Sequence, residues 1–382
     1  MRILVAGGGI GGLAAALALT RTGHDVTVVE RAPRPGPAGA GIILAPNALH
    51  VLAALGVDAA PHSLPLPSMD VAAADGTVLR RVEPQNLGGG YGHIRALSRT
   101  ALHTALLEAL PPGARPVHGR AVASLRSTGT SVAVRFEGDA PSAPGGTYDL
   151  VVGADGIRST VRAHAAARPP ALRHSGATCW RGLTDNPGVA TAVESWGPGT
   201  TCGLVPLPGD RLYYYLVRSA PRRAPAPGWP DGFRRVFAHH RGAPARLLDS
   251  LTGPPPLHHD LEELDAPVWG RGRVLLVGDA AHAMTPNLGQ GAAMAVEDAY
   301  ALALALRPGA EGASDRYRAL RHRRVRAVQL ASRHGGTVAR WRNPVARVLR
   351  ETALRRMPAG LAERRYRELV DPALALLRHP AA

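Results

Sequence analysis

The sequence predicts an α/β protein: a Rossmann-like dinucleotide-binding domain, an inserted β-sheet domain and C-terminal helices. Within the first 30 residues, an apolar run, a glycine-rich turn, an Ala/Leu-rich stretch and a second apolar run follow one another. Two more short apolar runs, at 149–153 and 273–277, each lead into a turn that carries glycine and aspartate. Between these runs short β-rich segments dominate, and after residue 291 the pattern becomes helical. Alternation of strands with helices is typical of a parallel sheet.

The elements are expected in the following order. Strands at 2–6 and 24–30 flank a helix at 13–20, and a Pro/Gly loop at 31–41 leads to a helix at 47–55. A hairpin at 71–82 turns at Asp75-Gly76. The remaining expectations are a helix at 99–110, strands at 122–125, 131–136 and 149–153, short strands from 176 to 218, Pro-rich linkers at 220–230 and 253–256, a strand at 273–277, and helices after 291 with turns near 308 and 344.

This order divides the chain into discontinuous domains. The dinucleotide-binding domain is expected to comprise 1–70, 96–170 and 266–330. The substrate domain is expected to comprise 71–95 and 171–265, and residues 331–382 form a C-terminal helical segment.

Composition limits the classes of function. The 382 residues are 45% hydrophobic, enough for a large core, and the net charge is +16. Every basic residue is arginine and aromatic residues make up only 4%, so we interpret the charge as a compositional bias that can attract anionic ligands, and we expect no nucleic-acid partner. The two cysteines form no disulfide framework and no metal site.

Membrane insertion and export are not expected. The longest strictly apolar runs, near 13–19 and 299–306, fall short of the ~18 residues that a spanning helix needs. Glycines interrupt the apolar start of the chain, and no clean signal-peptide cleavage site follows. We therefore expect a cytoplasmic protein.

The first chemical motif is Gly7-x-Gly9-x-x-Gly12, between the first strand and the first helix. The first glycine permits the tight turn, the second lets the backbone approach a pyrophosphate, and the third permits close packing of helix on strand. The helix N-terminus presents free N–H groups to the phosphates. Glu30 ends the second strand, where a carboxylate can accept hydrogen bonds from both ribose hydroxyls. Arg31 is placed either over the adenine or in solvent.

Two further turns carry polar residues at strand ends. Residues 152–159 run from a strand through Asp155 into a helix that Ser159 can cap, which is also how an ordinary strand-to-helix turn is built. Residues 278–282 contain Asp279 and His282, and Pro286, Gly289, Gln290 and Gly291 precede the next helix. Asp279 can hold a polyol chain, and the N–H groups of the helix start can stabilise negative charge on a flat ring. His282 either belongs to the site or, as we favour, supports the loop.

The three motifs in this order and at these separations resemble those of group A flavoprotein monooxygenases, the p-hydroxybenzoate hydroxylase-like family. Further matches are Glu30-Arg31, residues 39–42 with 46–48, Arg99-x-x-Leu102, residues 180–182 and the stretch from 317 to 324. The resemblance covers most of 1–330 and is strongest for the short salicylate and urate hydroxylase-like branch. It implies a glutathione reductase-like FAD-binding domain.

The resemblance also implies a cofactor, a reaction and site residues. FAD would bind with its ADP part on Gly7, Gly9, Gly12 and Glu30, and Arg99 and Asp279 would hold the pyrophosphate and ribityl region. Asp155 would lie in the motif that serves FAD and the transient NADH or NADPH. Pro286, Gly289, Gln290 and Gly291 would lie against the isoalloxazine. Flavin reduction by NAD(P)H, formation of a C4a-hydroperoxide with O₂ and transfer of OH to an aromatic or heteroaromatic molecule would follow.

Tyr213, Tyr214 and Tyr215 lie in one predicted strand, where alternation places Tyr213 and Tyr215 on one face. Two phenols on one face suit a flat aromatic substrate near the flavin, so we name Tyr213 and Tyr215, with Pro286 and Gly289, as candidate catalytic residues. A sheet core whose hydroxyls reach water explains the same pattern. Thr201 lies near where urate-type members carry an arginine, which weakens a urate assignment. His93 and Arg95 are better explained as solvated loop residues.

Two alternatives remain open at this stage. The same fold could serve a flavin-dependent reductase or an epoxidase acting on an alkene or isoprenoid. The chain could also be a non-catalytic flavin-binding module. The Arg-rich C-terminal helices are interpreted as solvated faces, and the protein as a monomer or homodimer.

Overall fold

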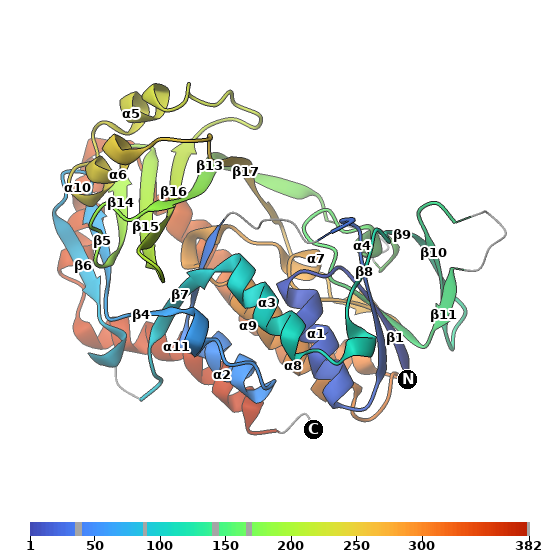
Figure 1. Cartoon of the computed structure of the whole chain (residues 1–382). Helices are drawn as coiled ribbons and strands as arrows, with labels where there is room; N and C mark the ends of the chain where they lie inside the picture. The colour runs from blue at the N-terminus through green and yellow to red at the C-terminus, as the bar shows by residue number, and fades with distance from the viewer. Residues whose placement is uncertain (35–39, 87–89, 140–144, 166–169, 380–382) are drawn as a thin grey trace.

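The computed structural model describes residues 1–34, 40–86, 90–139, 145–165 and 170–379. Two sheets lie at opposite sides of the molecule, and helices from the beginning and the end of the chain lie between and below them (Figure 1). This arrangement places a parallel sheet opposite a largely antiparallel one.

A six-stranded sheet gathers segments from three distant parts of the chain. Its order is β18-β19-β12-β1-β2-β8, and every neighbouring pair is parallel except β18–β19. Ile3, Leu4 and Val5 are fully buried, as expected for a parallel sheet covered on both faces. The strands are β1 (Arg2–Ala6), β2 (Asp25–Glu30), β8 (Val117–His118), β12 (Leu150–Gly153), β18 (Gly270–Arg271) and β19 (Val274–Leu276).

Different layers cover the two faces of this sheet. On one face lie α1 (Ile10–Arg21) and α8 (Gly291–Leu306), whose many alanines allow close packing in one large apolar cluster. On the other face lie α4 (Thr160–Ala165) and a three-stranded sheet. That sheet consists of β9 (Val122–Ser127), β10 (Val132–Phe136) and β11 (Gly146–Tyr148).

A seven-stranded sheet forms the second half of the molecule. Its order is β17-β13-β16-β15-β14-β5-β6, antiparallel except for β14–β5. One face is covered by α5 (Asp231–Phe237) and α6 (Ala243–Ser250), which pack on Trp180 and Tyr214. The strands are β5 (Met69–Ala73), β6 (Val78–Val82), β13 (Leu172–Asp185), β14 (Ala192–Gly197), β15 (Thr200–Leu207), β16 (Arg211–Ser219) and β17 (Leu257–Leu264).

A small sheet and two helices join the two halves. The sheet order is β3-β7-β4, formed by β3 (Gly41–Leu44), β7 (Ile94–Ser98) and β4 (Leu64–Leu66). Helix α2 (Pro46–Ala54) begins at a proline, and α3 (Arg99–Ala109) begins after Ser98, whose hydroxyl accepts from the Ala101 N–H at 3.0 Å. Gly41 therefore lies at the border between the two halves, beside the ring of Tyr213.

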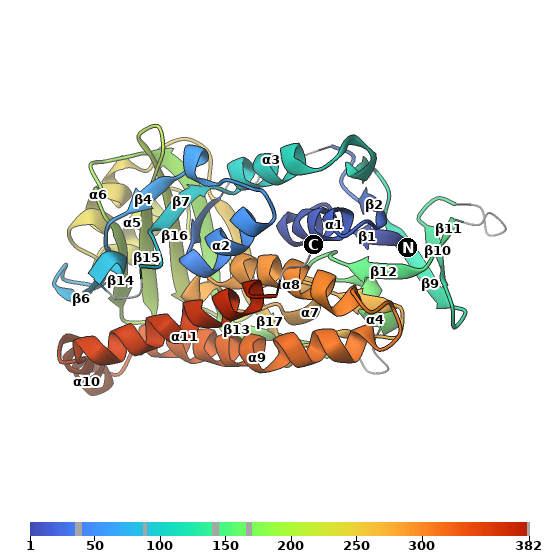
Figure 2. The ribbon, with the colours of Figure 1, turned by 90° about the horizontal axis from the view of Figure 1, so that it is seen from below.

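Three helices close the chain. Helix α9 (Ala313–Ala339) runs along the molecule from the parallel-sheet half to the seven-stranded half, and α11 (Ala359–Leu377) lies beside it (Figure 2). Helix α10 (Pro344–Arg355) connects them and begins at Asn343, whose side chain accepts from the Ala346 N–H. Across the described ranges, no helix combines the length and apolarity needed to span a bilayer.

The structure agrees with the predicted α/β class and with the helical end of the chain. The segments expected to be short strands include the 14-residue β13. The predicted linkers flank two helices, α5 and α6, that the sequence analysis missed because both helices are short and lie between prolines and glycines. The domain boundaries remain a prediction; the one after residue 70 falls within β5, and the one after 330 falls within α9.

Candidate active site

The glycine-rich turn between β1 and α1 has the shape its motif predicts. Gly7 has φ +115°, and a Cβ at Gly12 would lie 1.9 Å from the Gly7 carbonyl oxygen. A Cβ at Gly9 would meet nothing within 4 Å, and no side chain caps the start of α1. The turn thus presents open space in front of free helix N–H groups, which fits the pyrophosphate of a dinucleotide.

Glu30 lies beside this turn. Its carboxylate accepts from the Gly8 N–H at 2.7 Å and from the Ala32 N–H at 2.8 Å. These bonds fix the carboxylate at the end of β2 and leave it half-buried, where it can still accept from ribose hydroxyls. Arg31, the neighbouring candidate, is exposed.

The three predicted turns, which follow β1, β12 and β19, lie close together in the structure. A Cβ at Gly7 would lie 2.3 Å from the Ala154 carbonyl oxygen and 3.0 Å from the Asp155 nitrogen. Cβ atoms at Gly11 and Gly278 would lie 3.2 Å and 3.1 Å from the Ala295 Cβ of α8. The turns after β1, β12 and β19 therefore surround one region at the carboxyl edge of the parallel sheet, where ligands of open α/β sheets bind.

The Asp155 side chain is hydrogen-bonded to the start of α4. Its carboxylate accepts from the N–H groups of Thr160 at 2.7 Å and Val161 at 3.1 Å, and from the Ser159 hydroxyl. Ser159 in turn accepts from the Arg162 N–H at 2.9 Å, so the predicted cap of α4 is confirmed. The Asp155 side chain thus completes the start of α4, and its contact with a cofactor stays a prediction.

The third turn and the loop that follows it have exposed residues. Gly278 has φ +58° and begins α7 (Asp279–His282), in which Asp279 is exposed. Pro286, Leu288 and Gly289 are also exposed, in and after the short 3₁₀ turn η4 (Pro286–Leu288). A Cβ at Gly289 or at Gly291 would meet nothing within 4 Å, which fits the flat face of a bound flavin.

Gln290 differs from the other residues of this loop, because its side chain is buried. It accepts from the Asn47 amide at 3.0 Å. A contact between Gln290 and the flavin would therefore come from its backbone, at the start of α8.

A buried ionic network, which sequence reasoning missed, lies behind the loops. Arg321 of α9 donates to Glu297 at 2.6 Å and to Asp298 at 2.7 Å, and all three side chains are almost completely buried. Asp298 also accepts from the Gly278 N–H at 2.9 Å and contacts His282 at 2.5 Å. His282 therefore supports the loop, as favoured from the sequence.

The same network reaches α2 and a second arginine of α9. Asn47 donates to Glu297 at 2.8 Å, and Arg324 donates to both Glu297 oxygens at 2.6 Å. The matched stretches at 46–48 and 317–324 contain Asn47, Arg321 and Arg324 of this network, but no signal in the sequence marked Glu297 or Asp298.

Acid should weaken the network. Burial alone would raise the pKa of Asp298, but the charges of His282 and Arg321 outweigh it and lower the pKa to about 2. A lowered carboxyl pKa contributes stability that is complete above the unfolded value of 3.8 and is lost as pH falls through about 2. The contribution is about 2 kcal/mol, of which about half is lost by about pH 3.

Urea unfolding of the wild type and Asp298→Asn at about pH 5 and about pH 3 measures this contribution. The difference in stability between them should shrink at the lower pH. Asp185→Asn is the control, because that carboxylate is 90% exposed. An equal difference at both pH values would contradict the assignment.

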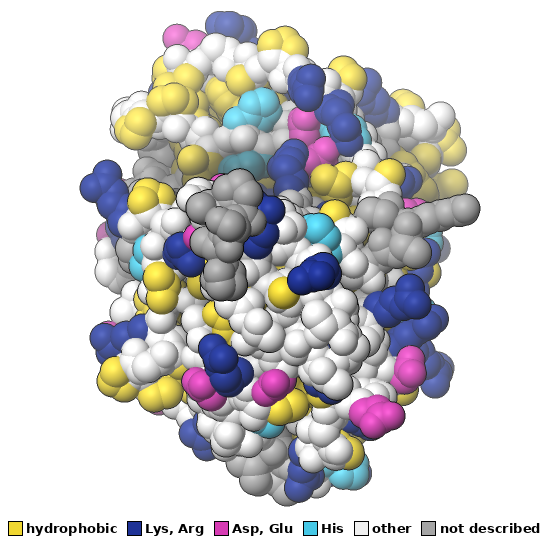
Figure 3. Space-filling model, turned by 90° about the vertical axis from the view of Figure 1, so that its right-hand side faces the viewer, with side chains coloured by type: hydrophobic (Ala, Val, Ile, Leu, Met, Phe, Trp, Pro, Cys, Tyr) yellow, Lys and Arg dark blue, Asp and Glu magenta, His cyan; other side chains and the backbone are white. Residues whose placement is uncertain are grey.

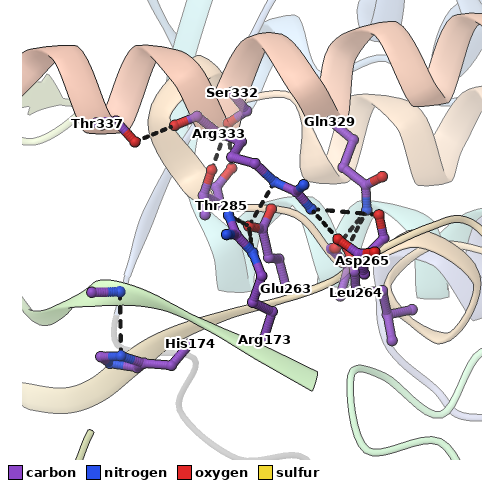
Figure 4. Close-up of polar contacts among 12 residues, drawn as sticks. Arg173, His174, Glu263, Leu264, Asp265, Thr285, Gln329, Ser332, Arg333 and Thr337 are labelled. Carbon is purple, nitrogen blue, oxygen red and sulfur yellow. Dashed lines mark hydrogen bonds and ion pairs between the residues drawn. The ribbon is translucent and has the colours of Figure 1, made fainter. Parts of the chain in front are cut away.

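A second network fixes the segment that precedes η4 (Figure 4). Ser332 of α9 donates to the Thr285 carbonyl at 2.6 Å, and Gln329 donates to the carbonyls of Leu264 at 2.8 Å and Ala283 at 3.2 Å. In the same view Glu263 of β17, fully buried, accepts from Arg173 at 2.7 Å and from Arg333 at 2.9 Å. Helix α9 thus holds both the loop before η4 and a strand of the seven-stranded sheet.

The three tyrosines of β16 divide between the two faces of their sheet. Tyr214 packs with Trp180 and Phe233 under α5. Tyr213 and Tyr215 share the opposite face, with ring centroids 5.9 Å apart. A Cβ at Gly41 would lie 2.5 Å from the Tyr213 Cβ, so this face is turned toward the dinucleotide-binding half. Burial raises the pKa of Tyr213 to about 12, against the opposing charges of Arg181 and Arg99.

The remaining candidates separate clearly. Arg99 is exposed at the start of α3, while Arg95 donates to Ser63 at 2.6 Å and to nearby carbonyls and is a structural residue. His93 is exposed.

Within the described ranges no group of three or more His, Cys, Asp or Glu residues is placed to hold a metal ion, and both cysteines are free and buried. On the face shown in Figure 3, arginine side chains are scattered among uncharged atoms.

Comparisons with known proteins agree on one family. A family model described as an FAD binding domain matches residues 1–332. The 2-heptyl-3-hydroxy-4(1H)-quinolone synthase of Pseudomonas aeruginosa is 38% identical over 390 residues, 97% of each chain. The 3-hydroxybenzoate 6-hydroxylase of Polaromonas naphthalenivorans is 33% identical over 366 residues, 88% of this chain and 87% of the relative. HpxO of Klebsiella pneumoniae, crystallised with FAD and uric acid, superposes with a TM-score of 0.87 at 25% identity, covering 98% and 97% of the two chains.

Proposed function

Because this chain belongs to the group A FAD-dependent monooxygenases, in their short salicylate and urate hydroxylase-like branch, we propose that it hydroxylates a heteroaromatic ring of the 4-quinolone class. The overall reaction consumes O₂ and NAD(P)H, inserts one oxygen atom into the substrate and releases water. FAD, when bound, supplies the redox chemistry. The chain supplies binding, orientation and exclusion of water.

The residues that would hold FAD are those of the converging turns. Gly7, Gly9 and Gly12 would admit the pyrophosphate to the N-terminus of α1, and Glu30 would accept from the ribose. Support comes from the open space in front of Gly9 and from the fixed carboxylate beside it. Arg99 and Asp279, both exposed at helix starts, would hold the pyrophosphate and ribityl region.

The isoalloxazine would lie against the loop from Pro286 to Gly291. The exposed Pro286 and Gly289 and the free space at Gly291 support this placement. The start of α8 would direct N–H groups at the ring and favour negative charge on it. Tyr213 and Tyr215 would then bound the substrate on the opposite side.

One observation carries the choice of substrate class. Identity to the quinolone synthase is 38% and spans 97% of both chains, whereas the hydroxybenzoate hydroxylase is 33% identical over a smaller share. Thr201 is buried on the same face of the sheet as Tyr213 and Tyr215, and in the sequence it lies near the position where urate-type members carry an arginine. A neutral heteroaromatic ring therefore fits better than urate.

The test is a substrate panel on the purified holoenzyme. We expect a yellow protein that releases FAD, and we expect 2-heptyl-4(1H)-quinolone to accelerate NAD(P)H oxidation with a product heavier by one oxygen atom. Parallel runs with 3-hydroxybenzoate and salicylate test the carboxylated class, and NADH is compared with NADPH. A folded protein without flavin would overturn the proposal, as would O₂-independent turnover of an isoprenoid.

We extend the proposal to the cellular location and the oligomeric state of the protein. Dependence on NAD(P)H supports a cytoplasmic location, and a monomer or homodimer is consistent with a site built within one chain. Light scattering of the purified holoenzyme determines the assembly.

A further inference from the structure

A row of side chains crosses the seven-stranded sheet on its substrate-facing side. Arg181 of β13 pairs in register with Tyr215 of β16, Tyr215 with Gly203 of β15, and Gly203 with Glu194 of β14. The four positions therefore lie side by side on one face. Tyr213, two residues along β16, shares that face and borders the dinucleotide-binding half.

Gly203 makes the row continuous. A Cβ at position 203 would lie 1.8 Å from the Tyr215 Cζ, so only glycine lets the phenol ring lie across β15. The Tyr215 hydroxyl thereby reaches β14 and donates to Glu194 Oε2. Trp196 Nε1 donates to the other carboxylate oxygen, Oε1, at 2.6 Å.

Two buried polar atoms beside the row have no protein partner among the described residues. The Thr201 hydroxyl lies on the same face in the next row of the sheet, and Thr201 is 2% exposed. Arg340 Nη1 comes from the end of α9, on a residue that is 8% exposed. Buried polar atoms are nearly always paired, so unpaired ones next to a carboxylate–phenol pair indicate a polar ligand.

We propose that this row binds a substrate through an ionisable ring N–H or O–H, and that Tyr215 passes the proton of that group to Glu194. This inference rests on the proposed function and concerns the same site. The N–H or O–H bond breaks and its electron pair stays on the ring. Tyr215 Oη gains that proton while its own proton moves to Glu194 Oε2. The ring becomes richer in electrons, which is what attack by its carbon on an electrophilic oxygen requires.

The electrostatics suit a proton acceptor. Burial raises the pKa of Glu194, while the hydrogen bonds of Tyr215 and Trp196 and the charge of Arg340 oppose the rise, and a base with a raised pKa works nearer neutral pH. Burial also raises the pKa of Tyr215, so the tyrosine acts as a neutral relay. The titratable and charged groups near the pair on its own face are Arg181 and Cys179 of β13, Tyr213 of β16 and Arg340 at the end of α9. Cys202 of β15 interacts with Glu194 from the opposite face, and Arg350 of α10 lies over the Trp196 ring.

The experiment compares Glu194→Gln and Tyr215→Phe with the wild-type holoenzyme in single turnovers. The control is Tyr214→Phe, on the same strand but the opposite face. The probes are 2-heptyl-4(1H)-quinolone and 3-hydroxybenzoate, each beside its N-methyl or O-methyl counterpart, which has no ring proton to lose. FAD content and the rate of flavin reduction by NAD(P)H are measured separately.

We expect both relay variants to oxygenate the ionisable probe about 100-fold more slowly at neutral pH, with FAD content and flavin reduction unchanged. The wild-type rate should fall as pH decreases and Glu194 becomes protonated. Glu194→Gln should lack that fall and recover at high pH, where the probe ionises in solution. Tyr214→Phe should match the wild type.

Wild-type rates and pH profiles in both relay variants would overturn the inference while leaving the proposed function intact. So would equal oxygenation of a probe and its methylated counterpart. If the wild type oxygenates neither ionisable probe, the inference is also wrong. If it oxygenates no compound of the substrate panel, the proposed function itself is wrong.

Discussion

Replacing Arg321 with methionine is expected to lower the free energy of unfolding by about 3–5 kcal/mol and to release FAD from the purified protein. Arg321 neutralises both Glu297 and Asp298, which are fully buried. Without its guanidinium, two adjacent carboxylates would lie in the core, and among the described residues Arg324 would remain paired with Glu297 and His282 with Asp298. Methionine fills much of the volume, so the effect reports the lost charge more than a cavity.

Loss of FAD should accompany the loss of stability, because the network fixes the turn at Gly278 and the start of α8, to which we assign the cofactor. Asp298 holds the Gly278 N–H, and Glu297 holds Asn47, which holds Gln290. Urea unfolding and the ratio of flavin to protein absorbance measure the two effects. Arg318→Met is the matched control, because Arg318 lies on the same helix and is exposed. An Arg321→Met protein with wild-type stability and full flavin would refute the role of the network.

The sequence predicted the local parts of the site better than the long-range ones. Gly7, Gly9 and Gly12 lie within one turn, so their roles follow from backbone geometry and need no knowledge of the fold. The Asn47–Glu297 bond joins residues 250 positions apart. A buried carboxylate looks the same in sequence as an exposed one, and only the fold shows that Glu297 and Asp298 face Arg321.

Asp155 and Gln290 illustrate a second limit. Both lie in motifs that the family resemblance assigns to the cofactor, and both direct their side chains to protein partners. The motif indicates a turn at the edge of the sheet, but residue type alone does not say whether the side chain or the backbone would face a ligand. Tyr213 and Tyr215 were placed correctly because strand alternation is strictly local. Their link to Glu194 was not visible, since it depends on the register of β14 and β15.

Alanine at Gly9 should separate cofactor binding from folding, whereas alanine at Gly12 should damage both. The Gly9 backbone has φ −76°, which alanine adopts without strain, and its Cβ would meet no protein atom within 4 Å. The added methyl group would project into the space assigned to the pyrophosphate. We therefore expect Gly9→Ala to keep the apoprotein's stability within about 0.5 kcal/mol of the wild type and to weaken FAD binding at least about 100-fold, since a methyl group that blocks the close approach of a backbone N–H to phosphate removes a charge-assisted hydrogen bond.

Gly12→Ala supplies the contrast within the same turn. Its Cβ would lie 1.9 Å from the Gly7 carbonyl oxygen and 3.2 Å from the Ala154 Cβ. Neither the Gly7 carbonyl nor the backbone of α1 can rotate away as a flexible side chain could, so β1 and α1 would have to separate. We expect this to lower the free energy of unfolding by about 1–3 kcal/mol or more. Thermal unfolding of the two apoproteins and titration of each with FAD, followed by quenching of flavin fluorescence, measure both quantities. Full FAD affinity in Gly9→Ala would place the pyrophosphate elsewhere and would remove the first of the three turns from the cofactor site.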